Sequence, residues 1–199
     1  MTDLAAAGRR EATKQANRAA ILDAAREVFA ELGYGAATVR DIVRRTDLAT
    51  GTFYNYFPDK EAIFRALVEE SARQVREIVR AARREARDVE SFVREGYRAY
   101  FSYVASDRTL FEVMRRNAGT IRALFDTPAL GAGTEELEDD LRAAITAGVV
   151  PAHDARYMAA AMVGGGFEIA VRMLESDPPD VEGAVNFATS LFVGGLGRP

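Results

Sequence analysis

Apolar residues recur at three- and four-residue intervals along most of the chain, and this spacing predicts helices. A first helix has its apolar face between Ile21 and Leu32 and ends at Gly33. A second short helix begins at Thr38, with Asp41 three residues later in a capping-box position. Later helices are predicted at 50–56, 60–87, 89–105, 108–125, 134–147, 153–175 and 181–193. No segment alternates as a strand would, so the predicted fold is all-α.

The segment 38–57, TVRDIVRRTDLATGTFYNYF, predicts two short helices around a tight turn. Phe53 and Phe57 are four residues apart and share the inner face of the second helix. The outward face is polar and consists of Thr50, Thr52, Tyr54, Asn55 and Tyr56. Hydroxyl and amide groups bind phosphate oxygens and base edges. A helix-turn-helix with its second helix in the major groove is therefore predicted; the alternative is two packed helices with no such role.

Together with GYGAAT before it and PDKEAIFRAL after it, this segment resembles the DNA-binding domain of the TetR family of transcriptional regulators. The resemblance covers about 18–68. Two positions depart from the family pattern: Asp47 replaces a small turn residue, and Ala49 replaces a capping Ser or Thr. The resemblance implies an N-terminal three-helix DNA-binding domain at 1–60 with a basic N-terminal arm. It also implies a helical ligand-binding and dimerisation domain at 61–199.

The candidate DNA contacts combine the outward face of the second helix with side chains near its neighbours. Thr38, Arg40 and Arg44 are expected on phosphates, and the resemblance implies the same for Lys60, for which a solvated lysine is the alternative. The full set is Thr38, Arg40, Arg44, Thr50, Thr52, Tyr54, Asn55, Tyr56 and Lys60. Four basic residues, Arg9, Arg10, Lys14 and Arg18, precede or open the first helix. They form either a flexible arm that reaches DNA or a disordered solvated tail.

Composition narrows the class of protein. The chain has 199 residues and a net charge of −4. Residues 1–60 carry nine basic and eight acidic residues, so the excess of acidic residues lies in residues 61–199. It has no cysteine, and its one histidine, His153, sits at a helix start where a capping or surface role is expected. No nucleotide-binding, metalloprotease or serine-hydrolase motif is present. We therefore expect no enzyme, no metal site and no cofactor, and, without an apolar span or signal core, a cytoplasmic protein.

Small residues dominate one stretch of the helix at 153–175: Ala159, Ala160, Ala161, Gly164, Gly165 and Gly166. Glycine weakens an isolated helix, so another helix is expected to pack closely there. The last helix offers a partner face of Ala184, Val185, Ala188, Leu191 and Phe192. Proteins resembling TetR pair their last two helices into a homodimer. The alternatives are packing within one subunit, or space for a ligand.

A run rich in aromatic and large aliphatic residues extends from Phe92 to Phe125. In the family that this chain resembles, helices at these positions enclose an effector. The candidate ligand-binding residues are Tyr97, Phe101, Phe111, Met114, Arg115, Asn117, Phe125 and Glu168. A basic residue and an amide beside an apolar region suit an anionic head group on an apolar tail, such as a fatty acyl-CoA. An interface role for Glu168 stays open, and an aromatic or drug-like effector, controlling an efflux or catabolic operon, is the alternative.

These expectations combine into a ligand-responsive repressor that acts as a homodimer on a palindromic operator of double-stranded DNA.

Overall fold

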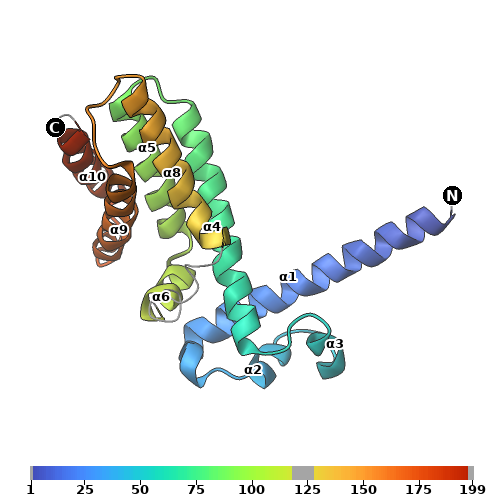
Figure 1. Cartoon of the computed structure of the whole chain (residues 1–199). Coiled ribbons are helices and arrows are strands. Elements are labelled where there is room, and N and C mark those ends of the chain that lie inside the picture. The colour runs from blue at the N-terminus through green and yellow to red at the C-terminus, as the bar shows by residue number, and fades with distance from the viewer. Residues whose placement is uncertain (1, 118–127, 197–199) are drawn as a thin grey trace. The chain divides into compact units, whose positions relative to one another are not determined.

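The computed structural model describes residues 2–117 and 128–196, and in these ranges every regular element is a helix (Figure 1). The all-α prediction is thus confirmed. In chain order the helices are α1 (Thr2–Ala36), α2 (Val39–Val43), α3 (Thr50–Tyr54), α4 (Lys60–Arg84), α5 (Val89–Ser106), α6 (Arg108–Arg116), α8 (Pro128–Thr146), α9 (Ala155–Met173) and α10 (Val181–Leu196).

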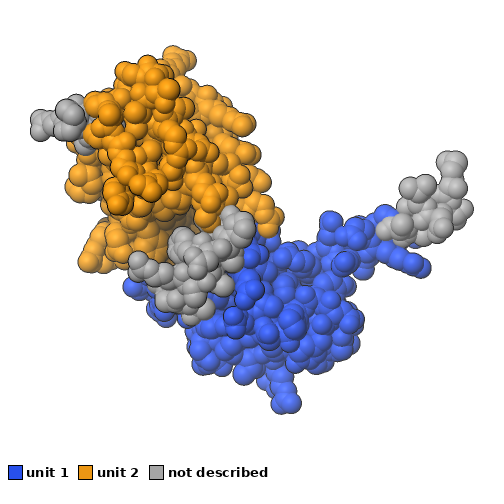
Figure 2. Space-filling view, in the orientation of Figure 1, with its two compact units in different colours: residues 1–70, 112–118 blue, residues 71–111, 119–199 orange. Residues whose placement is uncertain are grey.

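The contacts divide the chain into two compact units (Figure 2). Unit 1 comprises Met1–Glu70 and Glu112–Ala118, and unit 2 comprises Ser71–Phe111 and Gly119–Pro199. This division falls inside α4, whereas the sequence analysis divides the chain at residue 60; the functional boundary at residue 60 stays a prediction.

The N-terminal segment is helical from Thr2, so the expectation of a flexible or disordered arm is wrong. Its richness in alanine explains the difference, because alanine has the highest helix propensity and no proline interrupts the segment. The predicted end of the first apolar run is correct: Gly33 has a φ of +76°, which breaks the helical geometry there. Leu32, placed on the core face by its spacing, is 48% exposed instead.

The core of unit 1 joins α1, α3 and the start of α4. Ile21, Val28 and Phe29 of α1 are fully or almost fully buried, as are Phe53 of α3 and Phe64 of α4. The Phe29 and Phe64 rings meet edge to face, with their centroids 5.9 Å apart. Phe53 is fully buried and so anchors α3, which is too short to be stable alone.

One predicted boundary of the later helices is wrong. Helix α8 begins at Pro128, between the predicted helices at 108–125 and 134–147, because proline is compatible with the first position of a helix. Three arginines of α4 form ion pairs with α8. Arg76 and Arg80 lie 2.5 and 3.6 Å from Glu136, and Arg83 lies 3.9 Å from Asp140.

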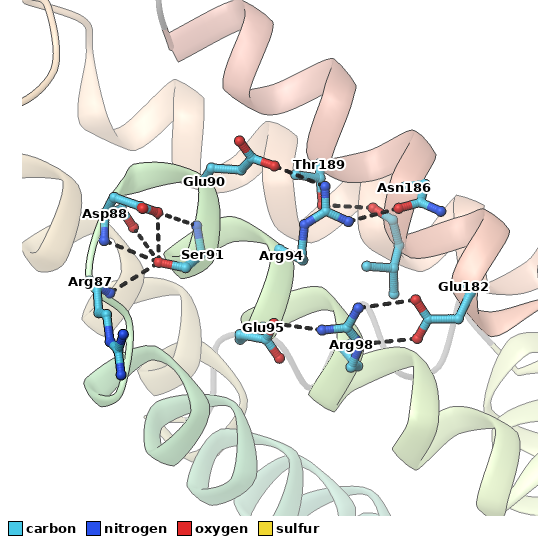
Figure 3. Close-up of polar contacts among 11 residues, drawn as sticks. Arg87, Asp88, Glu90, Ser91, Arg94, Glu95, Arg98, Glu182, Asn186 and Thr189 are labelled. Atoms are coloured by element: carbon cyan, nitrogen blue, oxygen red, sulfur yellow. Dashed lines mark hydrogen bonds and ion pairs between the residues drawn. The ribbon is translucent and has the colours of Figure 1, made fainter.

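In unit 2, α10 packs along α5, and a row of polar contacts follows this contact (Figure 3). Arg98 donates two hydrogen bonds of 3.0 Å to the carboxylate of Glu182, and Arg94 donates one of 2.7 Å to Asn186. The Arg98 guanidinium holds the pKa of Glu182 below its usual value. Val185, Ala188 and Phe192 of α10 are buried behind this polar row.

Candidate functional site

Helix α2 begins with the predicted capping box. The Asp41 amide donates to the Thr38 hydroxyl over 3.3 Å, and the Thr38 amide donates to the Asp41 carboxylate over 3.0 Å. These bonds to Thr38 hold the pKa of Asp41 below its usual value. The Thr38 side chain is exposed, and its hydroxyl also donates to Asp41 over 2.6 Å. The capping box fixes the entry into the helix-turn-helix.

Helix α3 is anchored by Phe53 and Phe57, which are buried as predicted. It is shorter than predicted, since it ends at Tyr54 and Asn55 serves as its C-cap. Ala49, at the N-cap, provides no side-chain hydrogen bond, and the helix starts without one. The exposed residues of this region include Thr50, Asn55 and Tyr54, and the Tyr54 ring is 52% exposed. Thr52 is half-buried. The polar face predicted for a nucleic-acid contact is therefore mainly open.

Tyr56 follows α3 and is held by α1. Asn17 donates a hydrogen bond from Nδ2 to the Tyr56 hydroxyl over 3.1 Å. The neighbouring Arg18 places its guanidinium 5.6 Å from the centroid of the Phe57 ring and 3.5 Å from Glu70. Asn17 belongs to no motif and is not predicted from the sequence, because only the fold brings position 17 to position 56.

The arginines of the helix-turn-helix differ in what they contact. Arg40 and Arg44 are exposed; the Arg44 side chain is 78% exposed and lies 4.0 Å from Asp41. Arg45 is instead paired with Glu31 and Glu27 of α1, with an Nη1–Oε1 distance of 2.9 Å to Glu31. Arg40 and Arg44 are thus the arginines that α2 leaves open for phosphate.

Lys60, the first residue of α4, lies over the end of α1. Its ammonium donates to the carbonyl oxygens of Tyr34, Gly35 and Ala37 over 2.7, 3.2 and 2.9 Å. It also lies 4.7 Å from the centroid of the Tyr34 ring. The structure therefore places Lys60 against the protein backbone, and not in the solvated position that the sequence analysis offered as the alternative to a phosphate contact.

The candidate ligand-binding residues fall into separate groups. Tyr97 and Phe101 of α5 stack with centroids 5.4 Å apart, and Phe111 of α6 meets Phe167 of α9 at 5.2 Å. These residues belong to unit 2, whereas Met114, Arg115 and Asn117 belong to unit 1. Phe125 lies outside the described residues. Within the predicted set, the ring contact between Tyr97 and Phe101 joins two members.

The polar members of that set have partners or are exposed. Arg115 donates from Nε and Nη2 to Glu112 over 2.8 and 2.7 Å, and Asn117 donates to the Val113 carbonyl over 2.7 Å. Glu168 is exposed on α9. Tyr100, which is not among the predicted residues, packs against Phe101. Burial raises the pKa of Tyr100, so its hydroxyl stays a neutral donor.

Helices α9 and α10 also carry an exposed surface of small and apolar residues. We call it the α9–α10 face; it comprises Tyr157, Ala160, Ala161, Gly164, Phe187 and Leu191. Tyr157, Phe187 and Leu191 are 75%, 61% and 51% exposed. Val185, Ala188 and Phe192 of the predicted partner face are buried within the subunit, so these three residues follow the alternative of packing within one subunit. The remaining glycines pack internally: a Cβ on Gly165 would lie 3.1 Å from Phe192.

Comparisons with known proteins agree with this arrangement. The family model for bacterial regulatory proteins of the tetR family matches residues 21–67. An uncharacterized HTH-type transcriptional regulator of Haemophilus influenzae is 25% identical over 62% of this chain and 60% of its own length. The HTH-type transcriptional repressor AcnR of Corynebacterium glutamicum is 43% identical over 32% of this chain and 34% of its own length. These alignments span less than two thirds of either curated relative.

Solved structures match over more of the chain. The fatty acid degradation regulator FadR from Bacillus halodurans has a TM-score of 0.78 at 26% identity, covering 92% of this chain and 97% of its own. The regulator FadR from Bacillus subtilis, in complex with stearoyl-CoA, has a TM-score of 0.76 at 26% identity, covering 88% and 97%. Within the described helices, none is long and apolar enough to cross a membrane.

Proposed function

We propose that this chain, which belongs to the TetR family of bacterial regulatory proteins, is a ligand-responsive transcriptional repressor. The observation that carries the proposal is the two-sided character of α3. Phe53 and Phe57 anchor it to the core, while hydroxyl, amide and phenol groups stay open on the other side. A helix held in this way can enter a major groove without rearranging the unit that supports it.

In the proposed complex, the residues of α3 and those just after it read the major groove. These are Thr50, Thr52, Tyr54, Asn55 and Tyr56. Asn55 and the hydroxyls can hydrogen-bond to base edges, whereas Arg40 and Arg44 contact phosphates. Thr38, also predicted on a phosphate, gives both its amide and its hydroxyl proton to Asp41 and instead fixes the start of α2. Positive charge is limited in this unit, so specific contacts have to supply much of the affinity.

The proposed repressor is a homodimer that binds a palindromic operator. Its interface is the α9–α10 face, because an apolar surface of this kind is unfavourable in water and the small residues allow close approach of a second helix. Glu168 lies one turn beyond Gly164 on the same side of α9 and is exposed there. We therefore assign Glu168 to the rim of this interface in preference to the effector site.

The proposed effector is a long-chain fatty acyl-CoA. Three observations support it: the aromatic residues of α5 in unit 2, the Tyr100 hydroxyl beside them, and the similarity to the FadR structures. The effector acts by binding one conformer of the dimer more tightly than the other, and it shifts the equilibrium only by that difference in affinity.

The DNA-binding part is tested with a duplex selected by the wild-type protein from a random library. Tyr54→Phe and Asn55→Ala should each weaken binding about tenfold, because each removes a hydrogen bond to a base edge. Arg142→Ala, an exposed arginine of α8 paired within its own helix, is the matched control and should bind normally. Normal affinity in both α3 variants would contradict the proposed docking.

The effector is tested by thermal unfolding of the wild-type protein in stearoyl-CoA, free coenzyme A and the aromatic dye ethidium. A ligand that binds only the folded state stabilises it by about 2.7 kcal/mol at a hundredfold excess over Kd. A saturable rise in Tm with stearoyl-CoA alone is expected. A rise with ethidium alone would favour the aromatic, drug-like alternative and contradict the acyl effector.

A further inference from the structure

The Lys60 ammonium donates hydrogen bonds to three backbone carbonyl oxygens at the end of α1, where the hydrogen bonds of the helix end. The last carbonyl groups of a helix have no intrahelical amide partner. Among the described residues, no backbone amide bonds the carbonyls of Tyr34, Gly35 or Ala37; the Thr38 amide, next in line, bonds the Asp41 carboxylate. Lys60 Nζ bonds all three carbonyls at 2.7–3.2 Å. An ammonium has three N–H donors, so each donor of Lys60 has one acceptor.

Electrostatics favour a cation at this place. The C-terminal end of a helix carries partial negative charge, and the last turn of α1 has no basic residue of its own. Lys60 supplies that charge from α4. The Tyr34 ring lies 4.7 Å from the ammonium and packs against Phe64 at 4.5 Å, so the cation rests on the aromatic core of unit 1. Lys60 and Tyr34 are both half-buried.

The three carbonyls border the turn that begins α2. Ala37 is buried and directly precedes Thr38, whose capping box starts the helix-turn-helix. Lys60 is also the first residue of α4. The ammonium therefore ties the first turn of α4 to the start of the helix-turn-helix, and it leaves no N–H for a phosphate oxygen.

We propose that Lys60 is a positioning residue for DNA recognition: it sets α2 and α3 through the α1–α2 turn and does not contact DNA itself. This inference rests on the proposed function.

The test compares Lys60→Met, Lys60→Arg and Arg44→Met, each measured well below its own unfolding midpoint. Binding to the selected duplex and to an unrelated duplex is followed by fluorescence anisotropy at several salt concentrations. Lys60→Met should bind the selected duplex at least about tenfold more weakly, which is the effect of losing a charged hydrogen-bonding group. Its binding to the unrelated duplex and its salt slope should match wild type. Arg44→Met, the phosphate-contact control, should weaken both duplexes and lower the slope by about one.

Lys60→Arg further separates the positioning role from a phosphate contact. It also provides a second test in case Lys60→Met folds poorly. A guanidinium binds phosphate well, but its planar fork does not direct three donors at three carbonyls around one point. Weak selective binding by Lys60→Arg is therefore expected.

Rescue by arginine, or a lower salt slope in Lys60→Met, would overturn the proposal in favour of a phosphate contact. A lower Tm with unchanged affinity for both duplexes would reduce Lys60 to a stabilising role and also overturn it. A wild-type protein that selects no duplex would instead remove the proposed function, and the positioning role with it.

Discussion

Asn17 of α1 donates a hydrogen bond to the hydroxyl of Tyr56, which lies two residues after the end of α3. The phenol oxygen accepts from the amide, so its own proton is free to point toward another acceptor. In the proposed complex that acceptor is a phosphate or a base edge. A residue 39 positions earlier in the chain thus orients a DNA-contacting side chain.

We expect Asn17→Ala to weaken binding to the selected duplex by a few-fold, roughly the value of one neutral hydrogen bond. The effect should vanish when Tyr56 is already Phe, because the amide then has no hydroxyl to orient. Affinities of the two single variants and the double variant form the cycle that measures this coupling. Additive losses would mean that Asn17 acts independently of Tyr56.

Gly166 of α9 faces Tyr97 of α5, whose hydroxyl donates to the Met162 carbonyl over 2.8 Å. A Cβ on Gly166 would lie 3.0 Å from Tyr97 Cε1, which is tighter than nearly all real Cβ contacts, so the buried Tyr97 ring would have to shift. We expect Gly166→Ala to lower the free energy of unfolding by about 1–3 kcal/mol. Gly133→Ala, where a Cβ meets nothing within 4 Å, is the control and should not destabilise. Denaturant titrations of both variants check the difference, and equal stabilities would contradict the close packing.

The α9–α10 face should control the oligomeric state. Leu191→Glu and Phe187→Glu place a charge on an exposed apolar position, which costs little in a monomer and much in an interface. We expect both variants to sediment as monomers and to lose affinity for a palindromic duplex. Leu32→Glu is the matched control, since Leu32 is a similarly exposed leucine on α1. Dimers in all three variants would refute this interface.

The pKa of Glu112 tests whether Arg115 is bound mainly to this carboxylate. Arg115, followed by Arg116, hydrogen-bonds its carboxylate and lowers the pKa of Glu112 to about 2. A carboxylate with a lowered pKa in the folded state adds stability at pH values above its ordinary pKa. That contribution is lost as pH falls from about 4.5 toward 2. Arg115→Ala should move the Glu112 titration midpoint upward, as followed by NMR. An unchanged midpoint would show that Arg115 is not its main partner, and would release Arg115 for the effector.

Local pattern was enough to predict most of the secondary structure. Phe53 and Phe57 identify the buried side of α3 because their spacing matches one face of a helix. The Thr38–Asp41 capping box could be read directly, since both partners are three residues apart and the interaction is local. The start of α8 at Pro128 was not predicted, because proline and glycine near a helix start do not by themselves prevent a helix. The helical N-terminal segment was not predicted either, because scattered charged residues do not prevent a helix.

The sequence by itself therefore determined the all-α class, the helix-turn-helix and the side of α3 that faces outward, since each depends on neighbours within one or two helical turns. Only the tertiary structure decided which charged and polar groups remain available. Lys60 and Arg45 carry the same charge as Arg44, yet packing brings three carbonyls to Lys60 and two glutamates to Arg45, while Arg44 stays open. Likewise Val185 and Leu191 look alike in the pattern of α10, and only the position of α5 buries one and exposes the other. The physical reason is that these outcomes depend on atoms far apart in the chain, which no local periodicity encodes.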